Sequence, residues 1–154
     1  MKKILVAIFI ILIFGGLVYS RLDKTVNTPD AKKVIITNQA GNDIIVNVEL
    51  AQTRKSQIQG LSDRQTLDKG QGMLFVFPEK EVRSFWMKNM HFPLDIIWLD
   101  DEKIIKISSN LASEGEKPAN LYSSDGPANY VLEVPANFCL ENNIVVGNKI
   151  FYNY

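Results

Sequence analysis

The 154 residues of this chain suffice for one domain of ordinary size, because domains commonly contain about 100–200 residues. A hydrophobic fraction of 46% excludes disorder of the whole chain, since disordered chains are much poorer in apolar residues. Seventeen basic residues balance seventeen acidic ones, and no run of Lys or Arg exceeds two residues, so we expect no nucleic-acid partner.

The N-terminus has the pattern of an export signal or a membrane anchor. Lys2 and Lys3 precede an uncharged, almost wholly apolar run over residues 4–20. The small residues Val18 and Ser20 would suit a cleavage site, whereas the length of the run favours an uncleaved anchor. Both alternatives stay open. Because lysines favour the cytoplasmic side, we expect the rest of the chain to be extracytoplasmic, either anchored to the membrane or exported after cleavage.

The chain therefore divides into an N-terminal signal or anchor segment (residues 1–20), a polar tether (residues 21–31) and a single β-rich domain (residues 32–154). The tether contains the sequence Asn27-Thr28-Pro29-Asp30, which disfavours regular structure. The expected partner of the N-terminal segment is the membrane.

The first elements of the domain read as a hairpin and a helix. Residues 34–37 are mostly β-branched, and residues 44–50 alternate apolar and polar side chains, so both are expected to be strands. The Gly- and Asn-containing turn at residues 40–43 would join them. Residues 52–59 contain good helix formers and end at Gly60, a residue type favoured just past a helix end.

The central part predicts four strands. Residues 72–77 form a continuous apolar run, which is consistent with a strand buried on both faces. Pro78 then begins a turn, and residues 82–87 read as the next strand. Two further strands are expected at residues 94–99 and 103–108, separated by an acidic turn.

The C-terminal part begins with a long polar stretch at residues 110–127, which we expect to be a loop; loops of that length are often functional. A strand at residues 130–134, a short helix within residues 135–142 and a closing strand at residues 149–152 complete the domain. These elements predict an α+β fold, mostly antiparallel β, with a small barrel-like sheet and one or two short helices.

Several uncommon short sequence motifs occur in one order along the domain, and together they give the chain a resemblance to a known family. They are GLSDR (60–64), GMLFVF (72–77), SFWMKNM (84–90), FPLDIIWLD (92–100), YVLEVP (130–135) and the late Gly147.

The chain resembles the prokaryotic proteins that share the domain of unknown function 192, over about residues 34–152. That resemblance implies a small, barrel-like α+β domain, often exported, with no established biochemical activity. Met90 departs from the family pattern, which commonly has a threonine-like residue there, and the sole histidine, His91, lies at a position that resembles a variable one.

A cluster of aromatic and polar side chains in residues 85–95 is the candidate binding surface. Strand alternation directs Trp86 and Lys88 to one face and Asn89 to the other. An aromatic ring, a flexible cation and an amide can form an apolar pocket with a few orienting polar groups, and Tyr122 of the long loop would add a hydroxyl. The alternative is that these aromatic side chains fill the core.

Asp95 lies inside a strand of Leu and Ile residues, where an unpaired carboxylate would be costly. We expect a cation to pair with it, and Arg54, Arg83 and Lys88 are the candidates. A structural ion pair and a functional carboxylate are both open. Asp95 and Arg54 therefore join the expected binding residues.

The leading hypothesis is a non-catalytic binding or accessory module for a small polar ligand or an envelope component. One alternative is an envelope carbohydrate hydrolase that uses Asp95 and Glu133 as paired carboxylates, which requires a separation of ~5–10 Å across a cleft. Another is an assembly domain that pairs through a free strand edge. No nucleophile elbow, phosphate loop or dinucleotide motif is present, and we expect neither cofactor nor metal. Cys139, the lone cysteine, is expected to be a buried hydrophobe.

Overall fold

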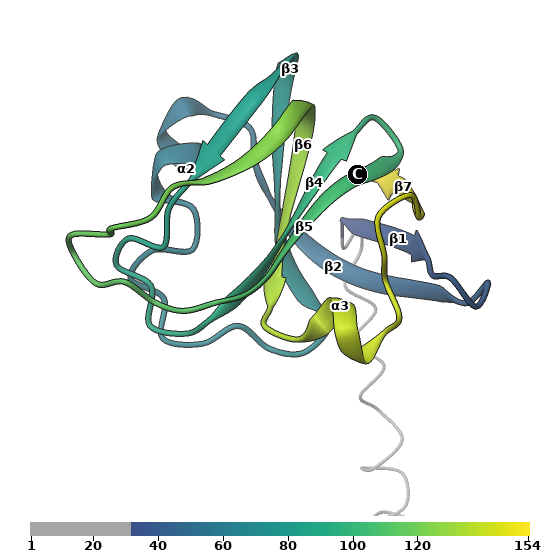
Figure 1. Cartoon of the computed structure of the whole chain (residues 1–154), viewed down its shortest axis with the longest axis horizontal. Helices are drawn as coiled ribbons and strands as arrows, with labels where there is room; N and C mark the ends of the chain where they lie inside the picture. Colours follow the sequence, from purple (N-terminus) through teal and green to yellow (C-terminus); the bar gives the residue numbers. More distant parts are fainter. Residues whose placement is uncertain (1–31) are drawn as a thin grey trace, which may run out of the picture. The chain divides into compact units, whose positions relative to one another are not determined.

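The computed structural model describes residues 32–154, so the expected N-terminal segment and tether lie outside the described residues. The described part is a closed barrel of seven strands in the order β1-β2-β3-β6-β4-β5-β7 (Figure 1). Its elements are β1 (Lys33–Thr37), β2 (Asp43–Ala51), α2 (Arg54–Gln59), β3 (Gln71–Phe85), β4 (Leu94–Asp100), β5 (Lys103–Leu111), β6 (Tyr122–Pro135), α3 (Phe138–Glu141) and β7 (Lys149–Asn153). Within residues 32–154, no helix has the length and apolarity needed to cross a membrane.

The barrel-like α+β fold expected from the sequence is confirmed. The β1–β2 hairpin is antiparallel with Thr37 opposite Asp43, and β1 also pairs with β7. The pairing of β5 with β7 that closes the barrel is short, because only Lys103 and Lys149 form a ladder pair there. Backbone hydrogen bonds from Ile104 N to Asn148 O and from Ile150 N to Glu102 O strengthen this seam.

The helix expected after the second strand is α2. Thr53 caps it in a reciprocal box with Ser56, whose hydroxyl accepts from the Thr53 N–H while the Thr53 hydroxyl accepts from the Ser56 N–H. Gly60 ends the helix with a φ of 50°. Because α2 lies in the crossover between β2 and β3, these two strands are parallel, with Asn47 opposite Gln71. The sheet is therefore mixed, although antiparallel pairs dominate.

Two predicted boundaries were wrong. The two strands expected on either side of Pro78 are one fifteen-residue strand, β3, which folds back on itself toward α2 (Figure 1). The register with β6 shifts between Val76 and Glu81, where the strand bends. The loop expected at residues 110–127 is shorter, because β6 begins at Tyr122 and pairs with the second limb of β3. The first residues of β6 are mostly polar. They form a strand because the second limb of β3 lies beside them and supplies their backbone hydrogen-bond partners.

The core has two parts on opposite faces of β4. All seven strands contribute buried side chains to the first cluster, including Ile97 and Leu99 of β4, so this cluster fills the barrel interior. The second cluster contains Ile96 and Trp98 of β4 together with Phe75 of β3. β4 is thus buried on both faces, which explains its continuous apolar run.

Candidate functional site

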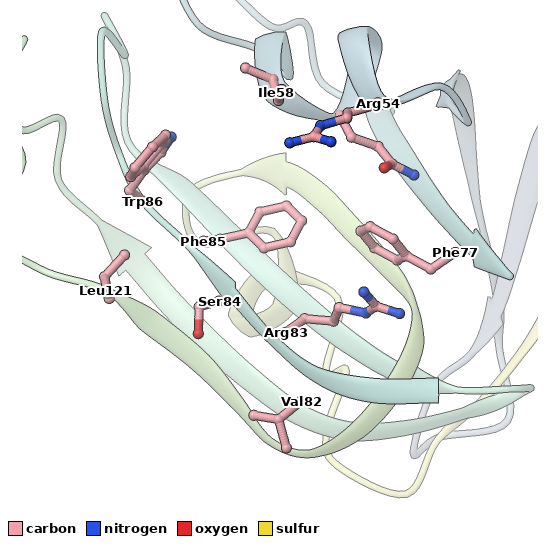
Figure 2. Close-up of a pocket in the computed structure, with 10 residues that line it drawn as sticks. Arg54, Ile58, Phe77, Val82, Arg83, Ser84, Phe85, Trp86 and Leu121 are labelled. Atoms are coloured by element: carbon pink, nitrogen blue, oxygen red, sulfur yellow. The ribbon is translucent and has the colours of Figure 1, made fainter. Parts of the chain in front are cut away.

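A pocket of about 390 Å³ lies between α2 and the second limb of β3 (Figure 2). This volume lies within the range of about 300–1,000 Å³ that is usual for small-molecule sites. The pocket is lined by Arg54, Gln57, Ile58, Phe77, Val82, Arg83, Ser84, Phe85, Trp86 and Leu121.

The floor of the pocket consists of two aromatic rings that the bend in β3 brings together. Phe77 and Phe85 are eight positions apart in one strand, yet their ring centroids lie 6.5 Å apart at an interplanar angle of 85°. Phe85 also makes edge contacts with Phe75 at 4.8 Å and with Trp98 at 5.4 Å. The floor is therefore continuous with the second core cluster, which holds the rings in place.

Exposed apolar side chains surround this floor. Ile58 on α2 is 64% exposed, Val82 on β3 is 59%, Trp86 is 48% and Leu121 is 70%. Trp86 directly follows β3 and Leu121 directly precedes β6, and all four side chains line one pocket. A scattered exposed apolar side chain needs no explanation, but a group gathered around a concavity marks an interaction surface.

Arg83 is the cation that holds the bend. Its guanidinium lies 4.2 Å from the centroid of the Phe77 ring, and its Nη1 lies 3.1 Å from Glu81 Oε2. Its Nε donates to Ala128 O and its Nη2 donates to Glu79 O. The hydrogen bonds and the charge of Arg83 are thus largely used within the protein.

Arg54 differs from Arg83 because it makes no hydrogen bond or ion pair through its side chain within residues 32–154. It lies exposed in the first turn of α2. Gln57, one helical turn later, donates its side-chain amide to Val76 O and to Ala51 O, which fastens α2 to the sheet. Lys88 lies beside the pocket, with its Nζ 5.7 Å from the centre of the Trp86 ring.

The structure brings part of the expected binding set together. Arg54 and Trp86 line the pocket, and Lys88 contacts Trp86. Asn89 instead forms a turn with a φ of 53°, and its N–H donates to Gly115 O. Tyr122 does not line the pocket, and its hydroxyl donates to Glu114 Oε1.

Phe77, Arg83, Ile58 and Leu121 line the pocket but were not predicted from the sequence. No local signal identified Ile58, because its exposure cannot be read from the sequence. Phe77 and Arg83 carried no signal either, because their proximity depends on the bend in β3.

The expectation that a cation pairs with Asp95 was wrong. Asp95 is fully buried, and its carboxylate accepts three backbone N–H groups: Oδ1 accepts from Asn110 at 2.8 Å and Asn137 at 3.1 Å, and Oδ2 accepts from Cys139 at 2.9 Å. Two of the three candidate cations, Arg54 and Arg83, line the pocket instead. N–H groups at the start of a helix lack partners within the helix, so one carboxylate here satisfies donors near α3 and at the end of β5.

Glu133 is buried without an adequate partner. It is 5% exposed, and its Oε2 has no hydrogen bond within the described residues. Burial raises the pKa of this carboxyl to about 8, because the nearby guanidinium of Arg64 offsets only part of the lost hydration. Arg64 itself forms two hydrogen bonds with Glu49, at 2.5 and 2.7 Å.

The two carboxylates do not form a glycosidase pair. In the β4–β6 ladder Asp95 lies opposite Val134, and Glu133 lies opposite Ile96. Val134 faces the barrel interior and Ile96 the second core cluster, so the carboxylates point to opposite faces of the sheet. Both are buried, and neither lines the aromatic pocket.

Cys139 is a buried hydrophobe, as expected. It is 3% exposed and free, and burial raises the pKa of its thiol. Within residues 32–154, no group of three or more His, Cys, Asp or Glu side chains could hold a metal ion.

The comparisons with known proteins agree with this architecture. The family model DUF192, described as "Uncharacterized ACR", matches residues 35–152. The chain belongs to the DUF192 family. The family expected from the sequence motifs is thus confirmed, and the match covers almost the whole described domain.

Two solved structures resemble this DUF192 domain. One is a crystal structure of a proposed transcription regulator from Sinorhizobium meliloti 1021, with 30% identity and a TM-score of 0.73, covering 79% of this chain and 94% of the other. The second is a protein of unknown function from Novosphingobium aromaticivorans DSM 12444, with 31% identity and a TM-score of 0.71, covering 77% of this chain and 83% of the other. No curated protein matches the chain significantly.

Replacing Asp95 by Ala is expected to destabilise the domain by about 3 kcal/mol, because it leaves the buried N–H of Cys139 and the partly buried N–H groups of Asn110 and Asn137 without this acceptor. Asp95→Asn should cost less, since its amide oxygen still accepts. Urea unfolding measures both, with Asp43→Ala as the control, an exposed carboxylate on β2. A loss under about 1 kcal/mol for Asp95→Ala would contradict the assigned role.

Glu133 makes stability depend on pH. Because the folded-state pKa of about 8 lies above the ordinary 4.5, the unfolded chain releases this proton first as the pH rises. The free energy of unfolding should therefore fall between about pH 4.5 and 8, by up to about 1.4 kcal/mol per unit from this group, and level off above. Glu133→Gln should remove that slope in urea titrations at several pH values, whereas the exposed control Glu102→Gln should keep it. Equal slopes in wild type and Glu133→Gln would refute the assignment.

Proposed function

We propose that this domain is a non-catalytic binding module whose ligand inserts an apolar group into the aromatic pocket between α2 and β3. One observation carries the proposal: exposed Ile58, Val82, Trp86 and Leu121 surround a floor of aromatic rings in a pocket of about 390 Å³. The ligand is a small molecule with a polar end, free or part of an envelope component.

The physical support is that the pocket is already formed. Phe77 and Phe85 are held by edge contacts, and Arg83 fastens the bend that carries them. A ligand therefore has little protein conformational entropy to overcome when it binds. Covering the exposed apolar side chains contributes about 25 cal/mol for each Å² removed from water, which is the main driving force available here.

Other functions find less support. The hydrolase alternative needs two carboxylates across a groove, whereas Asp95 and Glu133 are buried on opposite faces. The assembly alternative needs a long free strand edge, whereas the described strands close into a barrel. The name of the Sinorhizobium relative concerns transcription, but this chain has balanced charge and no basic run, so we do not propose nucleic-acid binding.

We further propose that the module works outside the cytoplasm, attached to the membrane by its N-terminal segment or released after cleavage. The support is Lys2 and Lys3 followed by the apolar run.

Protease added to intact spheroplasts should digest residues 32–154 under this topology. A cytoplasmic protein serves as the protected control, and a known external domain as the digested one. Immunoblotting with an antibody against the barrel measures the result. Protection of the barrel while the external control is digested would reverse the assigned topology.

Binding in the pocket predicts that Trp86→Ala and Ile58→Ala each weaken the affinity for the neutral probe 3-phenylpropanamide. Each substitution should remove about 1 kcal/mol of contact with the phenyl ring of the probe, which corresponds to an affinity about five-fold weaker. Ligand-observed NMR titration measures it without relying on tryptophan emission. Both side chains are exposed, so the melting temperature should change little. Leu140→Ala, which truncates an exposed apolar residue on α3, should bind as wild type does. Equal affinity in all four proteins would exclude this pocket.

A further inference from the structure

The charges that line the aromatic pocket are unbalanced. Within residues 32–154, its two charged lining residues are Arg54 and Arg83, and no carboxylate lines it. The charge of Arg83 is offset by Glu81 at 3.1 Å, and its N–H groups donate to backbone carbonyls. Arg54 has no such partner within residues 32–154, so its charge remains uncompensated at the pocket.

The two arginines flank the aromatic floor. Figure 2 shows the Arg54 guanidinium on the α2 side of the Phe77 and Phe85 rings, with Arg83 on the opposite side. A ligand resting on these rings would therefore cover or contact Arg54. A ligand without an acceptor group there would remove water from that guanidinium without replacing its hydrogen bonds, which costs free energy.

We propose that the ligand is a small amphiphilic anion whose carboxylate pairs with Arg54 while its aromatic or branched apolar body packs on Phe77, Phe85 and Trp86. This inference rests on the proposed function, because it names the ligand class of the same pocket. A guanidinium presents its N–H groups in a fixed fork that matches a carboxylate, and such charge-assisted bonds are about twice as strong as neutral ones.

The number and position of the free cations set further limits on the ligand. Only Arg54 among the lining residues is uncompensated within the described domain, which suits a single carboxylate. Lys88 lies outside the lining, on the Trp86 ring, and adds positive potential that attracts anions without fixing their orientation. The volume of about 390 Å³ suits a body the size of one ring with a short chain.

Three probes that each carry a phenyl ring on a three-carbon chain test this inference: 3-phenylpropanoate, 3-phenylpropanamide and 3-phenylpropan-1-amine. The carboxylate should bind about ten-fold tighter than the amide, and the amine should bind most weakly. Arg54→Gln should bring the carboxylate down to the affinity of the amide. Lys55→Gln removes the same charge from the next, exposed residue of α2, outside the pocket, and should keep the ten-fold preference. Ligand-observed NMR titration at low ionic strength measures all three.

The outcomes separate the two proposals. If the carboxylate and the amide bind equally to the wild type while Trp86→Ala weakens both, the anionic ligand class is overturned and the binding module stands. If no probe binds, or Trp86→Ala changes nothing, the proposed function fails. If Arg54→Gln does not fold, Arg54→Lys replaces it and should lower the preference for the carboxylate, because an ammonium lacks the fork. An acidic, Phe-containing peptide that binds ten-fold tighter than 3-phenylpropanoate would overturn the small-molecule assignment.

Discussion

The candidate site of this barrel depends on the bend in β3. Without it, Phe77 and Phe85 would lie far apart along an extended strand, and no aromatic floor would form. The bend is held by one arginine: Arg83 stacks on Phe77, pairs with Glu81 and donates to backbone carbonyls on both β3 and β6. One side chain thus couples the geometry of the strand to that of the pocket.

The start of β4 shows a different use of charge. Asp95 is buried and pairs with no cation of the described domain, but its three N–H donors satisfy the carboxylate and fasten α3 and the end of β5 to the barrel. Glu133, on the other face, has no hydrogen-bond donor to its Oε2 among residues 32–154, and it keeps its proton near neutral pH. The two carboxylates lie in similarly apolar strand segments but differ in hydrogen bonding and protonation. The reason is that only Asp95 lies next to backbone N–H groups at the ends of neighbouring elements.

Sequence reasoning succeeded where the signal is local. The capped helix before Gly60, the first hairpin and the apolar β4 all follow from turn chemistry, capping residues and periodicity. It failed at Pro78, which was read as a turn between two strands, because proline is also accommodated where a strand bends. It failed again at Tyr122, where a polar stretch is a strand because the second limb of β3 lies beside it.

The residues alone established the family, the α+β barrel class and the approximate elements, since these depend on side-chain patterns within short segments. They also indicated Trp86 and Arg54 as binding candidates, both of which line the pocket. Only the tertiary structure decided that Arg54 faces aromatic rings and not Asp95. The physical reason is that contacts across the barrel depend on which strands pair and on the bend in β3, and no short segment of sequence contains both partners of such a contact.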